Sequence, residues 1–383
     1  MRKNSKIHPS PLYILSPGQM MVAGFGFLIL LGAVLLASPI SSANGTSTSF
    51  IDAMFTATSA VCVTGLVVVD TSIHWSIFGK VVIILLIQVG GLGFMTLGTL
   101  VALIFGKKIN LRQRILIKEA LNQDELSGSV KLIKKVLKYT LLIEGLGALL
   151  LSFVFIPQFG LLKGVGYSIF TSISSFCNAG FDLMGRVSGE YSSIVSYYNR
   201  PLIVFTISAL IILGGIGFPV IINVVNKRNF KKLNLNSKLV LVTTAILIAG
   251  GFLMIFLGEM GHALHGMSLW EKFQVAFFQS VTTRTAGYAT IDLTQFREST
   301  LFVMMILMFI GASPASTGGG IKTTTAAILF IAVKSFIKNE NEIGVVMIES
   351  TRVQKVKKDN NSFMHKQKNI INECIRKNNM YLV

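Results

Sequence analysis

The sequence has few charged residues, few acids and only three cysteines among its 383 residues. Charged residues make up 14% of the chain and apolar residues 52%, a balance that an ordinary soluble domain does not show. The cysteines, Cys62, Cys177 and Cys374, make no disulfide framework. What is absent therefore excludes a soluble enzyme and a disulfide-stabilised secreted domain, and indicates an integral membrane protein.

The sequence is instead rich in long apolar runs. Six of them are long enough to cross about 30 Å of hydrocarbon. They cover about residues 20–39, 78–105, 139–156, 201–225, 239–257 and 299–311, and the last continues past an interruption to about 337. The first run lacks an A-x-A-like cleavage site after it, so we expect a retained helix and not a secretion signal. The sequence predicts an all-α polytopic membrane protein.

The chain has 35 Lys and Arg against 17 Asp and Glu. These basic residues lie between the apolar runs and not on an aromatic-rich face, which argues against nucleic-acid binding. Residues 106–138 hold nine Lys or Arg and 223–238 hold five, whereas 39–77 hold none. The positive-inside rule places the amino terminus, both basic linkers and the carboxyl-terminal tail in the cytoplasm, and 40–77, 157–199 and 258–298 outside. The linkers are expected to attract anionic lipid, and a surface for a partner protein is the alternative.

The outer segments repeat one motif. The three copies read FIDAMFTATSAVCVTGL, VGYSIFTSISSFCNAGF and KFQVAFFQSVTTRTAGY. When Gly65, Gly180 and Gly287 are aligned, a phenylalanine lies ten residues before each glycine: Phe55, Phe170 and Phe277. Three residues before each glycine lie Cys62, Cys177 and Arg284. This register predicts three copies of one structural unit.

The length of the motif suggests its structure. The apolar part before each loop has about ten residues, or about 15 Å of helix, which is half a membrane. Non-helical backbone at membrane depth is tolerated where it lines water or is buried in protein. Each repeat is therefore predicted to be a helix, a re-entrant half-helix with its loop, and a second helix. The loop glycine permits torsions that turn successive carbonyls toward one axis, as a site for a dehydrated alkali cation needs.

The candidate ion-binding residues lie in these loops: Cys62, Val63, Thr64, Gly65, Cys177, Asn178, Ala179, Gly180, Thr285, Ala286 and Gly287. An arginine at membrane depth is costly, so we interpret Arg284 as a support that binds loop carbonyls from behind, and an effect on the field at the cation is equally open. The side chains of Cys62 and Cys177 are interpreted as small apolar fillers.

The helices after the loops are rich in glycine. LIQVGGLGF and IILGGIGF follow the first two loops, and their glycines are interpreted as close-packing contacts. The third helix contains FIGASPASTGGGIKTTT, which is not a phosphate-binding loop, because Ile321 separates Gly320 from Lys322 and no strand precedes it. We expect this segment to break its helix beneath the third loop, where a gate would lie; a kinked helix is the alternative. The candidate gate residues are Ala312, Ser313, Pro314, Ala315, Ser316, Thr317, Gly318, Gly319, Gly320 and Lys322.

The sequence gives little evidence for a metal site or for a catalytic site. His262 and His265 have a spacing that could hold a metal, but no Cys or carboxylate cluster accompanies them, so a solvated outer loop is expected. The apolar runs offer no nucleophile with a base and no metal cluster, which argues against an intramembrane enzyme.

TSAVCVTGL, SSFCNAGFD, TTRTAGY and GASPASTGGGIKTTT together resemble the membrane subunit of Ktr-type potassium uptake systems, in the superfamily that also holds Trk and plant HKT transporters. The resemblance runs from about residue 12 to 337. It implies a pseudo-fourfold pore with one filter glycine per loop, here Gly65, Gly180 and Gly287, and an intramembrane gating loop at Ala312–Lys322. It further implies a multi-pass protein of the bacterial cell membrane and a homodimer on a ring of cytoplasmic nucleotide-binding regulators. The transported ion would be K⁺, with Na⁺ possible as a coupled ion in symport, and no covalent cofactor is expected.

The predicted division of the chain follows from these features. It comprises a cytoplasmic segment (1–19), pore repeat 1 (20–105), a basic linker (106–138), pore repeat 2 (139–225), a second basic linker (226–238), pore repeat 3 (239–337) and a polar basic tail (338–383). The family continues with a fourth repeat, which the tail does not resemble. We therefore expect a truncated or out-of-frame end, and a 383-residue product that is inactive in uptake and poorly accumulated. A non-conducting paralogue or a membrane scaffold for the regulatory ring is the alternative function.

Overall fold

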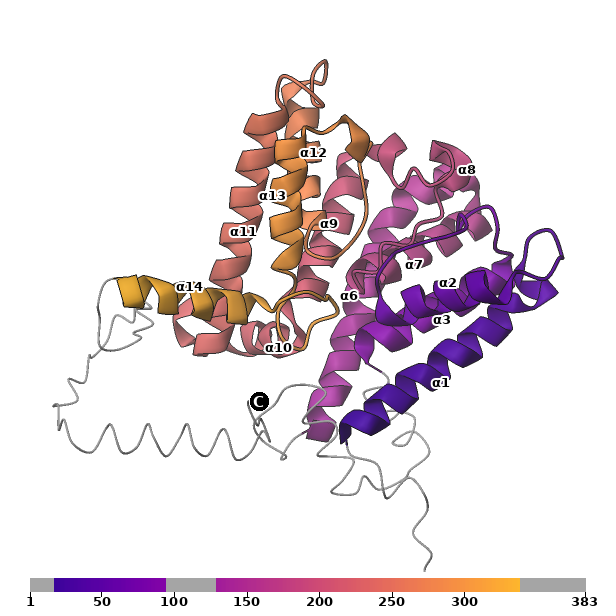
Figure 1. Cartoon of the computed structure of the whole chain (residues 1–383), viewed down its shortest axis with the longest axis horizontal. Coiled ribbons are helices and arrows are strands. Elements are labelled where there is room, and N and C mark those ends of the chain that lie inside the picture. The colour runs from indigo at the N-terminus through magenta and orange to yellow at the C-terminus, as the bar shows by residue number, and fades with distance from the viewer. Residues whose placement is uncertain (1–16, 94–128, 338–383) are drawn as a thin grey trace, which may run out of the picture. The chain divides into compact units, whose positions relative to one another are not determined.

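The computed structural model describes residues 17–93 and 129–337, which belong to one unit of the chain, Met1–Glu340 (Figure 1). Within these ranges the regular structure is helical, and the one β-type contact is an isolated bridge between Ser42 and Trp75. The predicted all-α class is confirmed. The amino-terminal segment to residue 16, residues 94–128 of the first repeat and linker, and the tail with Cys374 lie outside the described residues.

The first repeat consists of α1 (Pro17–Ala37), α2 (Phe50–Cys62) and α3 (Ile77–Leu92), with a short turn of helix, η2 (Pro39–Ser41), after α1. The three helices pack on one another, and η2 packs on α3. Ser76 begins α3 as its N-cap, because its hydroxyl accepts a hydrogen bond from the amide of Gly79 at 3.2 Å. Both α1 and α3 carry apolar side chains on most of their circumference, as is typical of helices in membrane proteins.

The second repeat is α6 (Ser129–Phe159), α7 (Leu161–Phe176) and α9 (Pro201–Ile216), followed by α10 (Phe218–Lys227). Gly160, at φ 80°, makes the turn between α6 and α7, which pack closely together. The connection from α7 to α9 contains α8 (Gly185–Ser188) and η3 (Val195–Tyr197). After η4 (Phe230–Lys232), the third repeat consists of α11 (Leu235–Glu259), α12 (Leu269–Thr282) and α13 (Glu298–Phe309), with η5 (Leu293–Gln295) before α13 and α14 (Thr323–Ile337) after it.

Helix lengths correct several predictions. Among the described residues, α1, α6 and α11 are long and apolar enough to cross a membrane by themselves. The predicted crossing at 201–225 is not one straight helix, because α9 and α10 meet at a bend of 98°. The helices before the loops have 13, 16 and 14 residues, or about 20 to 24 Å, which is longer than the expected half-helix but still shorter than a membrane. Helix α6 begins at Ser129, inside the expected linker.

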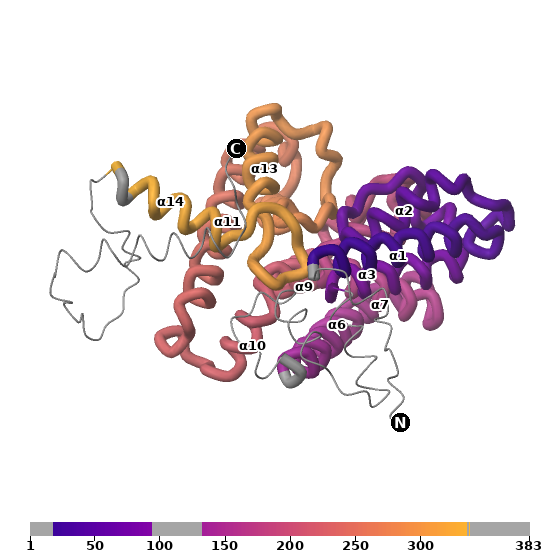
Figure 2. The backbone as a smooth tube through the Cα atoms, turned by 60° about the horizontal axis from the view of Figure 1, so that its bottom comes forward, coloured from indigo at the N-terminus to yellow at the C-terminus, as the bar shows by residue number. Residues whose placement is uncertain are grey.

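The repeats contact each other in chain order. Helix α3 of the first repeat packs on α7 of the second (Figure 2), and α9 of the second packs on α12 of the third. One buried apolar cluster spans the first two repeats, a second spans the last two, and a third lies within the third repeat. The second repeat is therefore the middle one, and its loop lies between the other two.

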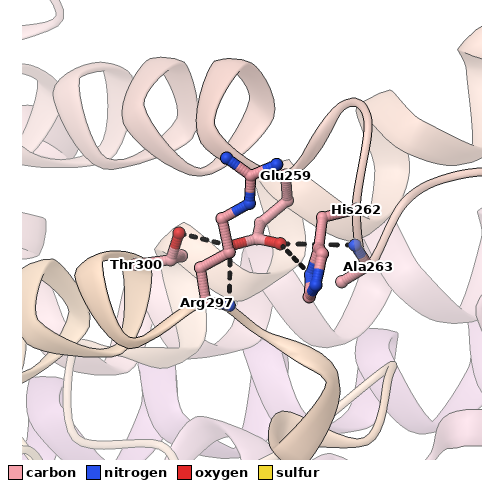
Figure 3. Close-up of polar contacts among 5 residues, drawn as sticks. All are labelled: Glu259, His262, Ala263, Arg297 and Thr300. Carbon is pink, nitrogen blue, oxygen red and sulfur yellow. Dashed lines mark hydrogen bonds and ion pairs between the residues drawn. The ribbon is translucent and has the colours of Figure 1, made fainter.

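A buried carboxylate joins the ends of α11 and α13 (Figure 3). Glu259 accepts hydrogen bonds from the backbone amides of Arg297 (3.0 Å) and Ala263 (3.3 Å) and from the hydroxyl of Thr300. His262 lies 3.4 Å away and is 51% exposed, and His265 is also exposed. The prediction of a solvated loop agrees with this exposure, and no group of three metal ligands occurs among the described residues. The carboxylate therefore joins the end of α11 to the start of α13.

Candidate filter loops and gate segment

The three loops share an unusual backbone. Val63, Asn178 and Thr285 each lie two residues before the aligned glycine, and each has a positive φ, at 57°, 57° and 65°. The glycines themselves have φ values of 74°, 71° and 82°. A chain that alternates between left-handed and other torsions points successive main-chain polar groups to one side. The repeated register found in the sequence is thus also a repeated backbone conformation.

The amide of the residue before each glycine bonds back to the short helix of its own repeat. Thr64 donates to the carbonyl of Ser59 (2.9 Å), Ala179 to Ser174 (2.8 Å) and Ala286 to Thr282 (3.0 Å). Hydroxyls brace the far side of the second and third loops: Ser174 donates to the carbonyl of Phe181 and Thr282 to that of Tyr288, both at 2.7 Å. The short helices therefore hold the loops through hydrogen bonds on the side away from the aligned glycines.

The loops meet at their glycines. A Cβ atom at Gly65 would lie 2.5 Å from the carbonyl oxygen of Ala179, and one at Gly180 would overlap the carbonyl oxygen of Ala286. At Gly287 the nearest described atom would be the Cα of Gly180, at 3.7 Å. The fold thus brings the predicted filter glycines together, from segments more than 100 residues apart in the sequence.

Two hydrogen bonds join the second and third loops directly. The Asn178 side-chain amide donates to the carbonyl of Arg284, and the Tyr288 hydroxyl donates to the carbonyl of Phe181, both at 3.0 Å and both buried. One bond lies before the aligned glycines and the other after them. These two loops are therefore fixed relative to each other on both sides of the glycines.

The Arg284 side chain makes no hydrogen bond to a loop carbonyl among the described residues, so its role as a filter support stays a prediction. Its side chain is 3% exposed, yet its guanidinium nitrogens have no hydrogen-bond partner among the described residues. The guanidinium extends toward α9, where Nε lies 4.0 Å from the Cβ position of Gly215. Only the backbone of Arg284 binds a loop residue, and its effect on the field at a cation stays a prediction.

The cysteines differ from one another. Cys177 is fully buried, as expected for an apolar filler, whereas Cys62 is exposed. Cys62 is the last residue of α2 rather than a loop residue, and Cys177 is the C-cap of α7, so both lie where a short helix gives way to its loop.

The predicted break in the last helix is present, because α13 ends at Phe309 and α14 begins at Thr323. Between them, the Thr317 hydroxyl donates to the carbonyl of Phe176 at 2.9 Å, and the Gly319 amide donates to the Thr285 hydroxyl at 3.1 Å. The amide of Ser313 donates to Gly215 at 3.0 Å. The segment therefore contacts both the base of the second loop and the third loop, and a merely kinked helix does not describe it.

The helix glycines have two distinct roles. A Cβ atom at Gly90 would overlap the carbonyl of Val61, and one at Gly214 would overlap the carbonyl of Phe176. Both carbonyls lie four residues before a filter glycine, so the packing interpretation is confirmed at these positions. Gly93 and Gly217 instead end α3 and α9 with φ values of 78° and 95°. The second pair permits a change of direction that a side chain would oppose.

Sequence reasoning missed two acidic residues near the loops. Glu144 is the single acid in the apolar run at 139–156, which is the signal that could have revealed it. It is 5% exposed and accepts hydrogen bonds from Gln88. Asp182 lies two residues after Gly180, and its carboxylate accepts a hydrogen bond from the amide of Met184 at 2.8 Å. Burial raises the pKa of Asp182 to about 6; the charge of Asp70 adds to the rise and the bond from Met184 opposes it.

The sequence matches one family model and is similar to potassium uptake proteins of other bacteria. The family model for TrkH, described as a cation transport protein, matches residues 13–383, and so extends past residue 337, where we expected the resemblance to end. Potassium/sodium uptake protein NtpJ of Enterococcus hirae is 46% identical over 327 residues, which cover 85% of this chain and 71% of the relative. Ktr system potassium uptake protein B of Bacillus subtilis is 42% identical over 333 residues, covering 85% and 72%.

A solved structure has the same fold. The crystal structure of the potassium transporter TrkH from Vibrio parahaemolyticus superposes with a TM-score of 0.64 over 92% of this chain and 68% of that chain, at 17% identity. At this identity the likeness concerns the fold alone.

Proposed function

This chain belongs to the TrkH family of cation transport proteins, and on that basis we propose that it is the pore-forming subunit of a Ktr-type potassium uptake system in the bacterial cell membrane. The observation that carries this proposal is the meeting of Gly65, Gly180 and Gly287, each preceded at the same distance by a left-handed residue. Three unrelated loops would have no reason to share this conformation.

In the proposed mechanism, K⁺ exchanges its water shell for main-chain carbonyls of the three loops. The residues that supply or position these carbonyls are 62–65, 177–180 and 285–287. The loops keep their spacing because their amides bond to their own helices and because Asn178 and Tyr288 join the second loop to the third. Such a site favours an ion that the carbonyls fit without moving, which is the basis for selecting K⁺ over Na⁺.

Residues 312–320 and Lys322 form the proposed gate. Thr317 and Thr285 hold this segment against the base of the loops, and Lys322 donates to the carbonyl of Gly318 at 2.9 Å within the segment itself. Opening would break these hydrogen bonds and the backbone bonds that join the segment to Gly214, Gly215 and Phe218, while the loops stay in place. The gate would then limit the rate of passage and not the recognition of the ion.

The proposed partners follow from the relatives. Three of them are named as Ktr system potassium uptake proteins, and another as a potassium/sodium uptake protein. We therefore propose a homodimer that works with a cytoplasmic nucleotide-binding regulatory ring, with Na⁺ as a possible coupled ion and no resident cofactor.

Rubidium uptake tests the function. We expect a bacterium that lacks its own potassium uptake systems to grow at low external potassium and to accumulate rubidium when it makes the full-length form of this protein with a fourth repeat, and to accumulate less when it makes the 383-residue chain. Membrane fractionation in the same cells measures how much protein is present. Uptake equal to that of empty cells, with the protein in the membrane, would contradict the proposal. If this inactive protein still bound a regulatory ring, the scaffold alternative would be favoured.

A further inference from the structure

We propose that Glu144 is a positioning residue for the second filter loop, acting through Gln88 on Cys177 and thereby on the choice of K⁺ over Na⁺. The inference rests on the proposed function for its effect on ion selection. Its structural part, that a buried carboxylate holds the loop in place, stands on the contacts between α3, α6 and the end of α7.

The contacts form a short chain of polar groups. The Gln88 Nε2 group lies 3.1 Å and 3.3 Å from the two carboxylate oxygens of Glu144, which is buried in the middle of α6. The other end of the same amide, Oε1, lies 4.0 Å from the Cys177 sulfur, which can donate a weak hydrogen bond to it. One amide therefore connects a carboxylate on α6 with a filter residue.

Cys177 is well placed to transmit this contact. It caps α7, lies three residues before Gly180 and directly precedes the left-handed Asn178, which binds the third loop. Gly91 leaves the space that its side chain occupies, because a Cβ atom there would lie 2.8 Å from the Cys177 sulfur. A displaced Cys177 would move the carbonyls at the start of the second loop.

The backbone of Glu144 strengthens the same junction. Its carbonyl oxygen accepts a hydrogen bond from the hydroxyl of Ser172 on α7, at 2.7 Å, and Ser172 is fully buried. Side chain and backbone of one residue thus contact two different elements that lead to the filter, α3 and α7. An apolar residue at position 144 could fill the space but would leave Gln88 without its carboxylate partner.

Glu259 provides the comparison that isolates this role. It is also a fully buried carboxylate with several donors, but these come from Ala263, Arg297 and Thr300, which are not filter-loop residues (Figure 3). If burial of a carboxylate mattered only for stability, the two residues would behave alike. If Glu144 positions the loop, only its loss changes Cys177 and ion selection.

The side-chain amide of Gln88 needs a hydrogen-bond acceptor at position 144 to fix its orientation. An amide can rotate so that its oxygen and nitrogen exchange places, and the acceptor on Glu144 favours the arrangement in which Oε1 faces the thiol. A glutamine at position 144 has a carbonyl that can accept the same hydrogen bond. Glu144→Gln is therefore expected to keep the arrangement, whereas Glu144→Ala removes the acceptor.

The first experiment measures access to Cys177 without any transport. In a Cys62→Ser, Cys374→Ser background, Cys177 is the only thiol, and its rate of reaction with a small maleimide reports movement of the loop. We expect Glu144→Ala and Gln88→Met to raise this rate about fivefold, the factor that the loss of one hydrogen bond gives. Glu144→Gln and the control Glu259→Ala should leave it unchanged.

The second experiment measures ion selection with the cysteines intact. The ratio of rubidium to sodium uptake should fall about fivefold in Glu144→Ala and Gln88→Met and stay near its original value in Glu144→Gln and Glu259→Ala. An unchanged maleimide rate in both Glu144→Ala and Gln88→Met would overturn the inference, whatever the uptake. If Glu144→Ala does not accumulate, Gln88→Met decides the result.

The two readouts separate the two proposals. A raised maleimide rate with a lower uptake ratio supports both. A raised rate with an unchanged ratio overturns the role in ion selection and leaves the proposed function in place. Uptake that is absent from the original protein overturns the proposed function, and the maleimide rate then decides the positioning role by itself.

Discussion

At the scale of the residue, the three filter glycines share a positive φ but differ in the space around Cα. Any side chain there meets the cost of a left-handed backbone, about 1–2 kcal/mol. At Gly65 and Gly180 it also meets a carbonyl oxygen of the next loop, whereas Gly287 has more room. The positions are therefore equivalent in conformation and unequal in packing.

This difference predicts a graded response to serine. We expect Gly180→Ser to raise the apparent KM for K⁺ and admit Na⁺, Gly65→Ser to do the same, and Gly287→Ser to have the smallest effect. Rubidium and sodium uptake would be measured for each. Gly250→Ser on α11 is the control, because a Cβ atom there meets nothing within 4 Å. Unaltered selectivity in Gly180→Ser would assign the glycines to packing alone.

Asp182 predicts a dependence of stability on pH. Its pKa is raised in the folded protein from the ordinary 3.8 to about 6, mainly by burial. Between these values the unfolded chain has lost the proton that the folded chain keeps, so this residue's contribution to stability falls as pH rises and is lost above about 6. Asp182→Asn removes this dependence.

Thermal unfolding of the purified protein measures the effect. The difference in melting temperature between Asp182→Asn and the original protein should be larger at about pH 7 than at about pH 4, in favour of the variant. Asp292→Asn is the control, since the pKa of the exposed Asp292 is lowered by hydrogen bonds from Thr294. A difference independent of pH would show that burial does not shift Asp182.

At the scale of the element, the gate segment between α13 and α14 is held by individual backbone and side-chain hydrogen bonds and not by a packed helix face. Thr317 binds the last turn of α7 and Thr285 binds Gly319. Elements attached by few contacts open locally at low free energy. This makes the segment suited to a gate while the loops above it remain fixed.

Removing one of these bonds should favour opening. We expect Thr317→Val, which keeps the shape of the side chain, to raise the maximal rate of rubidium uptake up to about fivefold with little change in KM. Shortening Ala312–Gly320 should act in the same direction. Ser316→Ala is the control, because its hydroxyl binds only the carbonyl of Ser313 within the segment. A changed KM with a constant maximal rate would instead assign the segment to ion recognition.

At the scale of the whole molecule, the distribution of charge predicts the orientation in the membrane. The linker with Lys231 is expected inside and the loop with His262 outside, and both side chains are exposed. In a cysteine-free background, a cysteine at position 262 should react with an impermeant maleimide in intact cells. A cysteine at position 231 should react only after the membrane is opened. The reverse result would invert the proposed topology.

The sequence by itself determined the helical class and the shared register of Gly65, Gly180 and Gly287, whose role as filter glycines stays a prediction. It could do so because hydrocarbon requires backbone hydrogen bonds to be made within helices, and because a loop at membrane depth needs glycine at a fixed place after a short helix. The break before Lys322 was predictable for the same reason, since Gly, Ser and Pro interrupt an apolar run.

Tertiary structure alone decided which of these segments meet. The packing of α3 on α7 pairs Gln88 with Glu144, residues separated by 56 positions. The packing of α9 on α12 leaves the Arg284 guanidinium beside Gly215 without a partner among the described residues, and Gly217 turns α10 away from α9 by 98°. Apolar periodicity cannot specify these contacts, because in a membrane lipid-facing and protein-facing surfaces are equally apolar, and close packing between helices decides their neighbours.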